Sequence, residues 1–522
     1  MSERDQMLSR RRTIQAIGSG TVAVSLAGCT GGNSSQTDNT DGFEITITQG
    51  TTPTTLDPHD NRSTSTDTVL MQSYEALLRR DADGNIQPEL ATDWERIDPG
   101  RFRFYIREGP RFHQTGNELA PEDVVYSINR VVKPSVGFES PQTSQLAGVT
   151  GAEVVDGERA VDLLSDGLNP LLPRQIPNNG QVIEKEWAQE HEKSYIAQHI
   201  NGTGPFQLTS YEQDVRAVFE RYDDYWRDEA AVSRLTFAGA QEPSVRVNQL
   251  IEGETDITVN IPPQSVSRVR SSEASITPAP STRIIYAAMK TTVEPFTSPQ
   301  FRRAMNYAVD IRSIIENILS GFGSATAQPT LEGFFGHNPE LEPYPYDPEQ
   351  ATQLVEESGF ADTTVTLHTP VGRYLRDVQI AQAVVEMIDE LPNVTAELKQ
   401  REFGSLSSEL VDGDITTGPA FYLIGWGNPQ MDASQTLIPT LTSDGTLTSW
   451  QNDKLDTLVE QAQNTSGDER KQLLQEANTH AHNQAPWIFL NRQYSVYGTS
   501  PRVDWQPRRD ERIDAYAVNP AE

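Results

Sequence analysis

The sequence contains a single cysteine, Cys29, among 522 residues. A disulfide within the chain is therefore impossible. The apolar stretch over residues 14–27 is broken by glycine and serine, and it is shorter than the ~20 apolar residues that a membrane-spanning helix needs. The chain has no internal repeat and no Walker motif, so the energy for any transport would come from partner subunits.

Lysine is also scarce, because only seven of the 42 basic residues are lysines, and 74 acidic residues bring the net charge to −32. Such a charge repels nucleic acid and anionic lipid, so no nucleic-acid partner is expected. The acidic residues are spread along the whole chain. This pattern favours solubility in concentrated salt, where charge repulsion is screened within a few ångströms, over a dedicated cation trap. It implies a salt-loving source.

Motifs for catalysis are missing as well. The segment from His191 to Tyr195 has tyrosine where a zinc protease needs its second histidine, and no G-x-S-x-G nucleophile motif occurs. We therefore predict no catalytic residue, no metal ligand and no cofactor. A secreted hydrolase remains the alternative from another functional class, because paired carboxylates have no fixed spacing in sequence.

The N-terminus has the pattern of an export signal. Arg10, Arg11 and Arg12 precede the apolar stretch, and adjacent arginines are typical of the twin-arginine route. Residues 26–29, Leu-Ala-Gly-Cys, resemble a lipoprotein processing box. We therefore predict an export signal over residues 1–28, lipid attachment at Cys29 and a disordered tether over residues 29–42. The mature protein is then expected at the extracellular face of the cytoplasmic membrane.

Periodicity predicts an α/β fold, since strands and helices alternate along the chain. Residues 43–48 and 101–106 alternate as strands. Pro121 and Asp347-Pro348 open helices, and Gly359 ends the second of these. A longer helix is predicted from Ser298 to Leu319, and a capping box of Ser466 with Glu469 precedes another.

Ordered blocks along residues 43–500 resemble a known family. They are 55–59 (TLDPH), 75–78 (EALL), 83–95 (DGNIQPELATDWE), 105–109 and 111–113 (YIREG, RFH), 120–127 (APEDVVYS), 202–206 (GTGPF), 222–226 (YDDYW), 301–310 (FRRAMNYAVD), 346–351 (YDPEQA), 425–426 (GW) and 485–488 (APWI). In this order they resemble the family 5 extracellular solute-binding proteins, which include oligopeptide-, dipeptide- and nickel-binding members. With its signal, the chain looks like a haloarchaeal-like lipoprotein of that family.

The resemblance implies a periplasmic-binding-protein-like fold with three domains in two lobes, joined by a hinge around a ligand cleft. Lobe 1 would comprise residues 43–87, 201–283 and 488–522, with an insert domain over 88–200, and lobe 2 would comprise residues 284–487. The implied function is the substrate-binding component of an ABC importer rather than an enzyme. The expected chain is a monomer that closes on a solute and delivers it to permease subunits driven by cytoplasmic ATPases.

Two segments are expected to bind the ligand. Arg373 follows a β-like run, in a segment that resembles the one placing an arginine on a ligand carboxylate, and Arg376 is its alternative. Trp426 follows Phe421-Tyr422-Leu423-Ile424 and offers a flat apolar face. We predict that Arg373 and Trp426 line the same cavity.

Three further ligand contacts are predicted around Trp426, namely Tyr422, Asn428 and Asp432. Peptide-binding relatives carry an aspartate soon after the Gly-Trp pair for the amino terminus of the ligand. Here Asn428 and Pro429 occupy the near positions, and Asp432 comes later. The ligand therefore stays open: a di- or oligopeptide is the first expectation, with an oligosaccharide or a nickel complex as alternatives.

Overall fold

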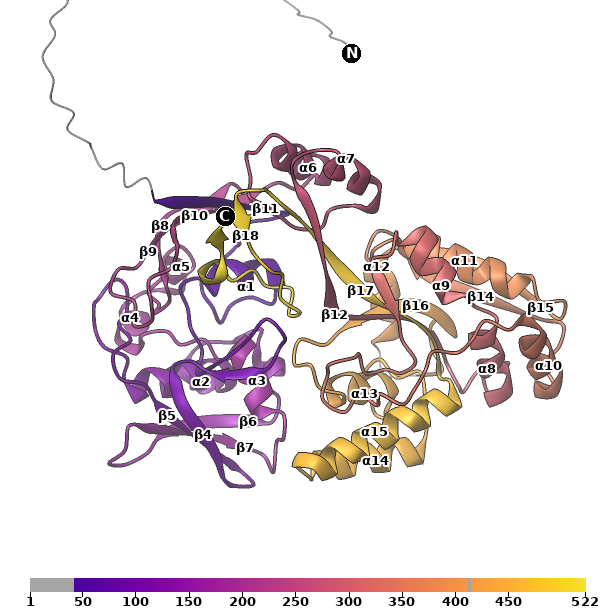
Figure 1. Ribbon diagram of the computed structural model, residues 1–522. Coiled ribbons are helices and arrows are strands. Elements are labelled where there is room, and N and C mark those ends of the chain that lie inside the picture. Colours follow the sequence, from indigo (N-terminus) through magenta and orange to yellow (C-terminus); the bar gives the residue numbers. More distant parts are fainter. Residues whose placement is uncertain (1–41, 412–414) are drawn as a thin grey trace, which may run out of the picture. The chain divides into compact units, whose positions relative to one another are not determined.

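The computed structural model describes residues 42–411 and 415–522 (Figure 1). Residues Gly42–Glu522 form one compact unit. The predicted export signal, Cys29 and nearly all of the predicted tether lie outside the described residues. Within residues 42–411 and 415–522, no helix is long and apolar enough to cross a membrane.

The main sheet of the described residues has eleven strands in the order β15-β14-β16-β12-β17-β11-β1-β10-β9-β8, with β13 paired to β17. Its strands are β1 (Phe43–Gln49), β8 (Phe206–Glu212), β9 (Arg216–Arg221), β10 (Val232–Gly239), β11 (Ile257–Thr258), β12 (Ser275–Met289), β13 (Gly323–Ala325), β14 (Thr363–Pro370), β15 (Val394–Arg401), β16 (Phe421–Gly427) and β17 (Trp487–Thr499). Strands distant in sequence are thus neighbours, and two long strands in the middle hold the halves of the sheet together.

These two strands, β12 and β17, pair antiparallel along nearly their whole length (Figure 1). The first half of β12 lies beside the end of β17, which also pairs with β11. The second half of β12 lies between β17 and β16. The register between β12 and β17 breaks between Pro280 and Ile284. Residues 281–283 therefore form an irregular step where the chain passes from one lobe to the other.

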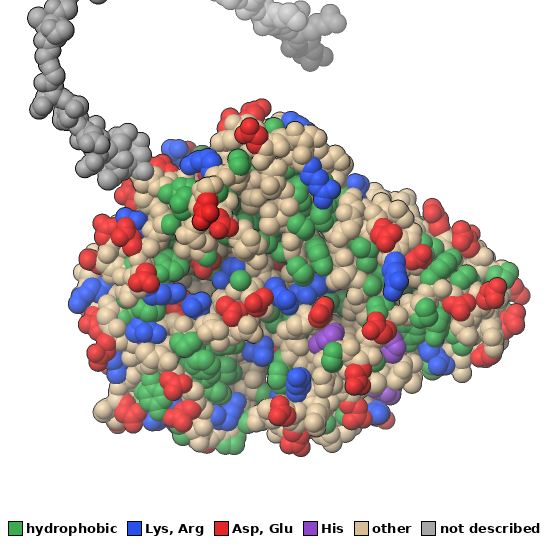
Figure 2. Space-filling model, viewed as in Figure 1, with side chains coloured by type: hydrophobic (Ala, Val, Ile, Leu, Met, Phe, Trp, Pro, Cys, Tyr) green, Lys and Arg blue, Asp and Glu red, His purple; other side chains and the backbone are tan. Residues whose placement is uncertain are grey.

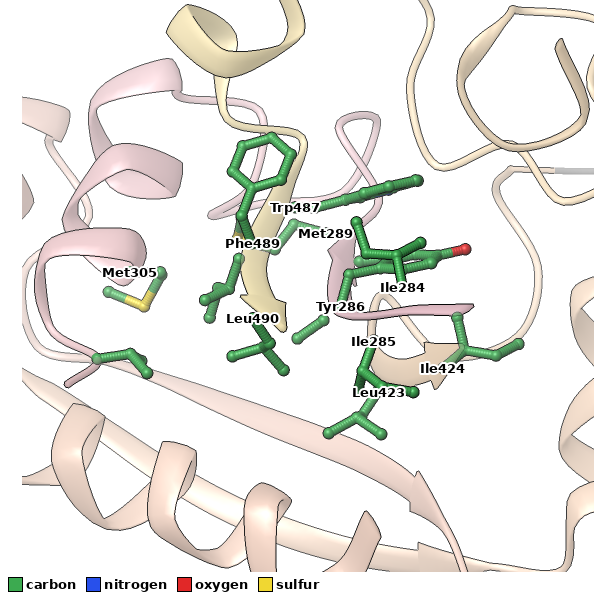
Figure 3. Close-up of a cluster of buried hydrophobic side chains, with 14 of the residues drawn as sticks. Ile284, Ile285, Tyr286, Met289, Met305, Leu423, Ile424, Trp487, Phe489 and Leu490 are labelled. Atoms are coloured by element: carbon green, nitrogen blue, oxygen red, sulfur yellow. The ribbon is translucent and has the colours of Figure 1, made fainter. Parts of the chain in front are cut away.

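The predicted lobe 2, residues 284–487, contains most of one cluster of buried side chains, which extends from Ile284 to Leu490 in sequence. Figure 3 shows part of it, with Tyr286 and Trp487 from the two central strands face to face. Their ring centroids are 3.6 Å apart and their planes differ by 15°. The surrounding helices are α8 (Pro299–Tyr307), α10 (Pro348–Ser358), α11 (Asp377–Asp389), α12 (Phe403–Leu410), α13 (Ser434–Leu441), α14 (Asp453–Gln463) and α15 (Gly467–Gln484).

The predicted lobe 1 contains one cluster of buried side chains beside the main sheet and one in a smaller sheet. A third cluster packs residues 247–274 against Phe322 and Val496. The smaller sheet has the order β4-β5-β7-β6. Its strands are β4 (Ala91–Asp98), β5 (Arg101–Ile106), β6 (Val149–Val154) and β7 (Ala160–Ser165). Two short pairs of strands are β2 (Leu78–Arg80) with β3 (Ile86–Pro88), and β18 (Val503–Asp504) with β19 (Asn519–Pro520). The helices are α1 (Thr64–Leu70), α2 (Pro121–Val132), α3 (Leu172–Asn179), α4 (Lys185–Glu190), α5 (Lys193–Ile196), α6 (Pro243–Ile251) and α7 (Val266–Arg270).

Most predicted element boundaries are confirmed. The strands β1 and β5 begin at Phe43 and Arg101, and α2 begins at Pro121. The side chain of Asp347 accepts a hydrogen bond from the Gln350 N–H at the start of α10, and Gly359 ends that helix with φ of 80°. A left-handed glycine at this place is the common helix terminator.

Two local predictions are wrong. The long helix predicted from Ser298 to Leu319 is interrupted, because α8 ends at Tyr307 and Asp310 caps a new turn by accepting a hydrogen bond from the Ser313 N–H. The predicted capping box at Ser466 is absent, although α15 does begin there, because the Ser466 side chain makes no cap hydrogen bond. Both errors concern side-chain hydrogen bonds rather than hydrophobic periodicity.

The surface matches the expected charge distribution. Figure 2 shows acidic side chains scattered over the visible face, with arginines and lysines between them. The acidic groups on this face are thus dispersed, as the sequence indicates. Dispersed acids keep a protein soluble without creating one strong cation site.

Candidate ligand-binding cleft

A cavity of about 840 Å³ lies between the two lobes, beside the step in β12. Lobe 1 contributes the end of β1, α1, the start of α6 and residues 259–264. Lobe 2 contributes residues 371–379, and β12 and β17 supply Arg283 and residues 493–497. A volume of this size is in the range of sites that enclose a small organic molecule.

Residues 371–379 form the lobe 2 wall of this cavity, and Asp377 holds them in place. Its buried carboxylate accepts hydrogen bonds from the backbone N–H groups of Gly372, Arg373 and Tyr374 at 3.2, 2.7 and 3.1 Å. Arg376 takes a left-handed conformation, with φ of 59°, at the start of α11. The loop is therefore rigid in its backbone while its arginine side chains extend from it.

Four arginines line the cavity. The guanidinium group of Arg246 donates to the carbonyls of Ala240, Gln241 and Val259, and the other three have no counter-ion among the described residues. Arg283 comes from β12, and Arg373 and Arg376 come from the loop after β14. None of them makes an ion pair with any residue in 42–411 or 415–522, and the buried Nε of Arg376 has no hydrogen-bond partner there. Arg373 instead lies over the rings of Phe403 and Tyr374, at 4.9 and 5.3 Å. Guanidinium groups placed this way offer paired N–H donors to an anion.

The Gly-Trp-Gly run at the end of β16 makes room for this wall. A Cβ at Gly425 would lie 2.8 Å from the Tyr374 ring, whose hydroxyl donates to the Gly425 carbonyl at 3.2 Å. A Cβ at Gly427 would lie 3.1 Å from the Arg283 guanidinium. The two glycines thus let Tyr374 and Arg283 pack directly against the strand.

Trp426 lies between these glycines but is not part of the cavity wall. Its indole Nε1 donates to the Gln435 carbonyl at 2.9 Å, and its ring is half-buried against the lobe 2 core. Trp426 is therefore not among the residues that line this cavity with Arg373, and a ligand contact by Trp426 stays a prediction. The indole hydrogen bond links the ring to α13.

The structure places Tyr422 and Asn428 inside lobe 2. Tyr422 is 2% exposed within the hydrophobic core, where burial raises its pKa. The Asn428 side-chain amide donates to the Asp432 carbonyl and the Thr436 hydroxyl, at 2.8 and 2.9 Å. Both side chains have neighbours within the lobe, so a ligand contact by either one stays a prediction.

Asp432 is fully buried and forms a two-pronged ion pair with Arg470 of α15. The Asp432–Arg470 oxygen–nitrogen distances are both 2.8 Å, and the Ser434 hydroxyl donates to the same carboxylate at 2.6 Å. Burial alone would raise the pKa of Asp432, but the hydrogen bonds and charge of Arg470 outweigh it and lower that pKa. The carboxylate is therefore committed within the protein.

The loop that carries Asp432, residues 428–433, also contacts lobe 1. Arg80 and Asn178 donate to the carbonyls of Gln430 and Pro429 at 3.1 and 3.0 Å. Arg174 of α3 donates to the Met431 carbonyl at 3.3 Å and lies 3.8 Å from the Asp432 carboxylate. This loop thus joins the lobes by direct contacts, on elements different from those that line the cavity.

Sequence reasoning missed four charged residues of the cavity, namely Arg246, Arg283, Asp377 and Glu511. Arg283 is the one charged residue in the run from Ile276 to Met289, and a lone charge in an apolar strand could have indicated it. Glu511 lies in a run of charged residues near the C-terminus, where no pattern distinguishes it from its neighbours.

The model for the middle region of the bacterial extracellular solute-binding proteins, family 5, matches residues 85–447. The chain belongs to this family. It is 26% identical to heme-binding protein A of Haemophilus influenzae, over 87% of each chain, and 24% identical to the dipeptide-binding protein of Escherichia coli, over 83% of this chain and 84% of that protein. The substrate-binding protein CtaP of Listeria monocytogenes shares its fold, with a TM-score of 0.82 at 22% identity over 92% of this chain and 100% of that one.

The likeness to solved structures confirms the predicted fold class, and membership of the family confirms the substrate-binding role. Family 5 proteins bind a small solute for an ABC importer and act with permease and ATPase subunits, as transport proteins rather than enzymes. Among residues 42–411 and 415–522, no group of three or more His, Cys, Asp or Glu side chains could hold a metal ion.

Proposed function

We propose that this family 5 protein captures a di- or oligopeptide, held by its carboxylate, in the cavity beside β12. The observation that supports this most directly is the set of three unpaired guanidinium groups of Arg283, Arg373 and Arg376. They stand in a chain whose net charge is −32, so a positive cavity is not a consequence of composition. Relatives named for dipeptides and for glutathione, which has two carboxylates, are consistent with this class of ligand.

The alternatives in the same role differ in their use of these arginines. A neutral oligosaccharide could accept hydrogen bonds from these guanidinium groups, but it would leave their three positive charges without a counter-ion in the closed cleft, which costs desolvation. A nickel complex could use them only through carboxylates of its chelator. Heme, which the H. influenzae relative is named for, carries two carboxylates and belongs in the same test.

The test is a titration of the purified protein with dialanine, glutathione, hemin, a trisaccharide and nickel–histidine, together with mass spectrometry of any ligand retained on purification. We expect binding of a peptide, and we expect Arg373→Ala to weaken it about 10-fold or more, as loss of a charge-assisted bond does. Arg312→Ala removes an exposed arginine outside the cavity and is the matched control. Binding of the sugar alone, unaffected by Arg373→Ala, would contradict the proposal.

Trp426 enters the same titration as a separate question. The sequence-based prediction gives its ring a ligand contact, whereas its half-buried position beside the lobe 2 core favours packing. Trp426→Phe removes the indole N–H bond to Gln435 and keeps an aromatic face. Unchanged affinity with a lower thermal midpoint would assign Trp426 to packing, and weaker binding at an unchanged midpoint would assign it to the ligand.

We also propose that the protein is a monomer anchored by a lipid on Cys29 at the extracellular face of the cytoplasmic membrane. The support is the Leu-Ala-Gly-Cys box after a basic, apolar N-terminus with paired arginines. Expression in a host with lipoprotein processing should place the wild type with membranes, whereas Cys29→Ser should be released. Equal membrane retention of both forms would overturn the anchor.

Adaptation to high salt is the last part of the proposal. It rests on the charge of −32, whose self-repulsion is screened in concentrated salt. The thermal midpoint should fall steadily as salt is lowered from molar to millimolar concentration. A midpoint independent of salt would remove this part and leave the binding role untouched.

A further inference from the structure

The cavity contains one carboxylate with unused hydrogen-bonding capacity, that of Glu511. Only two of its described lining residues are acidic, Asp377 and Glu511. Asp377 already accepts hydrogen bonds from the backbone N–H groups of residues 372, 373, 374 and 378. Asp432, the aspartate of the loop after β16, is fully engaged by Arg470. A cationic group in the cavity therefore has Glu511 as its one available acidic partner among the described lining residues.

The chain on either side of Glu511 fixes its position. Asp510 is buried and pairs with Arg508 at 2.6 Å, and Arg512 donates to Asp67 and Asn178 at 2.7 and 3.1 Å. With both neighbours anchored in lobe 1, Glu511 itself takes a left-handed conformation with φ of 64°. A non-glycine residue held there is strained, and such strain persists only where the surroundings impose it.

Two hydroxyl groups from the strands that join the lobes orient the carboxylate. Ser495 of β17 donates to one oxygen of Glu511 at 2.8 Å, and Thr282 of β12 donates to the other at 3.4 Å. Thr282 directly precedes Arg283, so the carboxylate and the cationic wall meet at the same step in β12. A carboxylate accepts about four hydrogen bonds, so two donors leave capacity for an ammonium group.

Resting on the proposed peptide function, we infer that Glu511 binds the protonated amino terminus of the ligand. The two kinds of charge in the cavity then have separate roles: the guanidinium groups bind the carboxylate of the ligand, and Glu511 binds its amine. This assigns the amine to the C-terminal segment of the chain instead of the loop after β16. The substrate class is a zwitterionic peptide with a free amino terminus, and an acidic peptide suits the excess of arginines best.

A pair of tripeptide libraries tests the inference. One has free amino termini, and the other is identical but Nα-acetylated, so both keep their carboxylates. Each is incubated with the protein, and retained peptides are measured by mass spectrometry after gel filtration. The wild type should retain the free-amine library about 10-fold or more over the acetylated one, as expected for a hydrogen bond between charged groups. Glu511→Gln should bring that ratio close to one.

Matched variants separate this role from a structural one. Glu254→Gln removes an exposed acid that does not line the cavity, and it should keep the wild-type ratio. Ser495→Ala keeps the carboxylate but loses one orienting hydroxyl, and should lower the ratio in part, which provides a second reading if Glu511→Gln folds poorly. A wild-type ratio near one, or a Glu511→Gln ratio equal to that of the wild type, would overturn the inference while leaving peptide binding intact. Retention of neither library would overturn the proposed function, and the inference with it.

Discussion

Two loops of lobe 2 follow neighbouring strands of the same sheet, and both look like ligand loops in the sequence. Residues 371–376 follow β14, and residues 428–433 follow β16. In the first loop, Arg373 and Arg376 reach the cavity with no ion-pair partner among the described residues. In the second, Asn428 and Asp432 are buried; Asn428 donates to Asp432 and Thr436, and Asp432 pairs with Arg470.

The difference shows that two loops at the same end of neighbouring strands can use their polar side chains in different ways. The polar groups of residues 428–433 are used to hold the loop on α15 and on lobe 1. In residues 371–376, by contrast, Asp377 bonds to the backbone N–H groups and leaves the arginine side chains available. A ligand loop is thus recognised by unpaired side chains on a rigid backbone.

The largest effect should come from breaking the second loop at Arg470. Arg470→Met removes the two-pronged partner of the buried Asp432 and leaves only Arg174, 3.8 Å away. Breaking a buried ion pair typically costs about 3–5 kcal/mol. We expect a markedly lower thermal midpoint for this variant. Lys454→Met breaks the exposed pair with Glu476 and is the control, with a midpoint close to that of the wild type. A midpoint for Arg470→Met as high as that of the control would show that the second loop is not held by this pair.

The same pair predicts a pH dependence. Because its pKa is lowered in the folded state, Asp432 stabilises the fold above its ordinary pKa near 3.9, and this contribution is lost as the pH falls through the lower folded value. In Arg470→Met, protonation would instead relieve a buried charge that has lost both of its hydrogen bonds to Arg470. The difference in thermal midpoint between wild type and variant should therefore narrow as the pH is lowered towards 3. A difference that stays constant from pH 7 to pH 3 would contradict this account.

A smaller effect should follow from releasing the second loop from lobe 1. Arg174→Gln removes the contacts to the Met431 carbonyl and the Asp432 carboxylate without touching the cavity wall. Because these contacts join the lobes, their loss should weaken ligand binding by a few-fold, equivalent to about 1 kcal/mol. Calorimetric titration with the ligand found for the wild type measures this, and faster ligand release is expected. Arg96→Gln, an arginine of lobe 1 that bonds only within that lobe, is the control.

The sequence predicts the fold in more detail than the site. Ordered motifs and hydrophobic periodicity locate β1, β5, α2 and α10, because these features depend on local spacing. Arg373 is found because it follows a recognisable strand. The roles of Asp432 and Glu511 depend on contacts with Arg470 and Ser495, which are distant or unremarkable in sequence. Which carboxylate is free and which is paired is a tertiary property, and one sequence does not display it.

The smallest effect on stability is expected at Arg283, and it tests directly whether an unpaired arginine is there for the ligand or for the fold. If Arg283 binds the ligand, its positive charge lies in the same cavity as two other unpaired guanidinium groups, and their repulsion destabilises the unliganded protein. Arg283→Gln should then leave the thermal midpoint of the unliganded protein unchanged or slightly raised, within about 0.5 kcal/mol. Its contact with the Tyr374 ring, at 5.8 Å from the centroid, lies near the outer limit of about 6 Å for a cation–π contact and is the one stabilising contact among the described residues that the variant would lose. The same variant should weaken peptide binding as Arg373→Ala does. A large fall in the midpoint would show that Arg283, like Arg470, stabilises the fold. Arg283 could then not be grouped with Arg373 and Arg376 as an arginine that is available to the ligand.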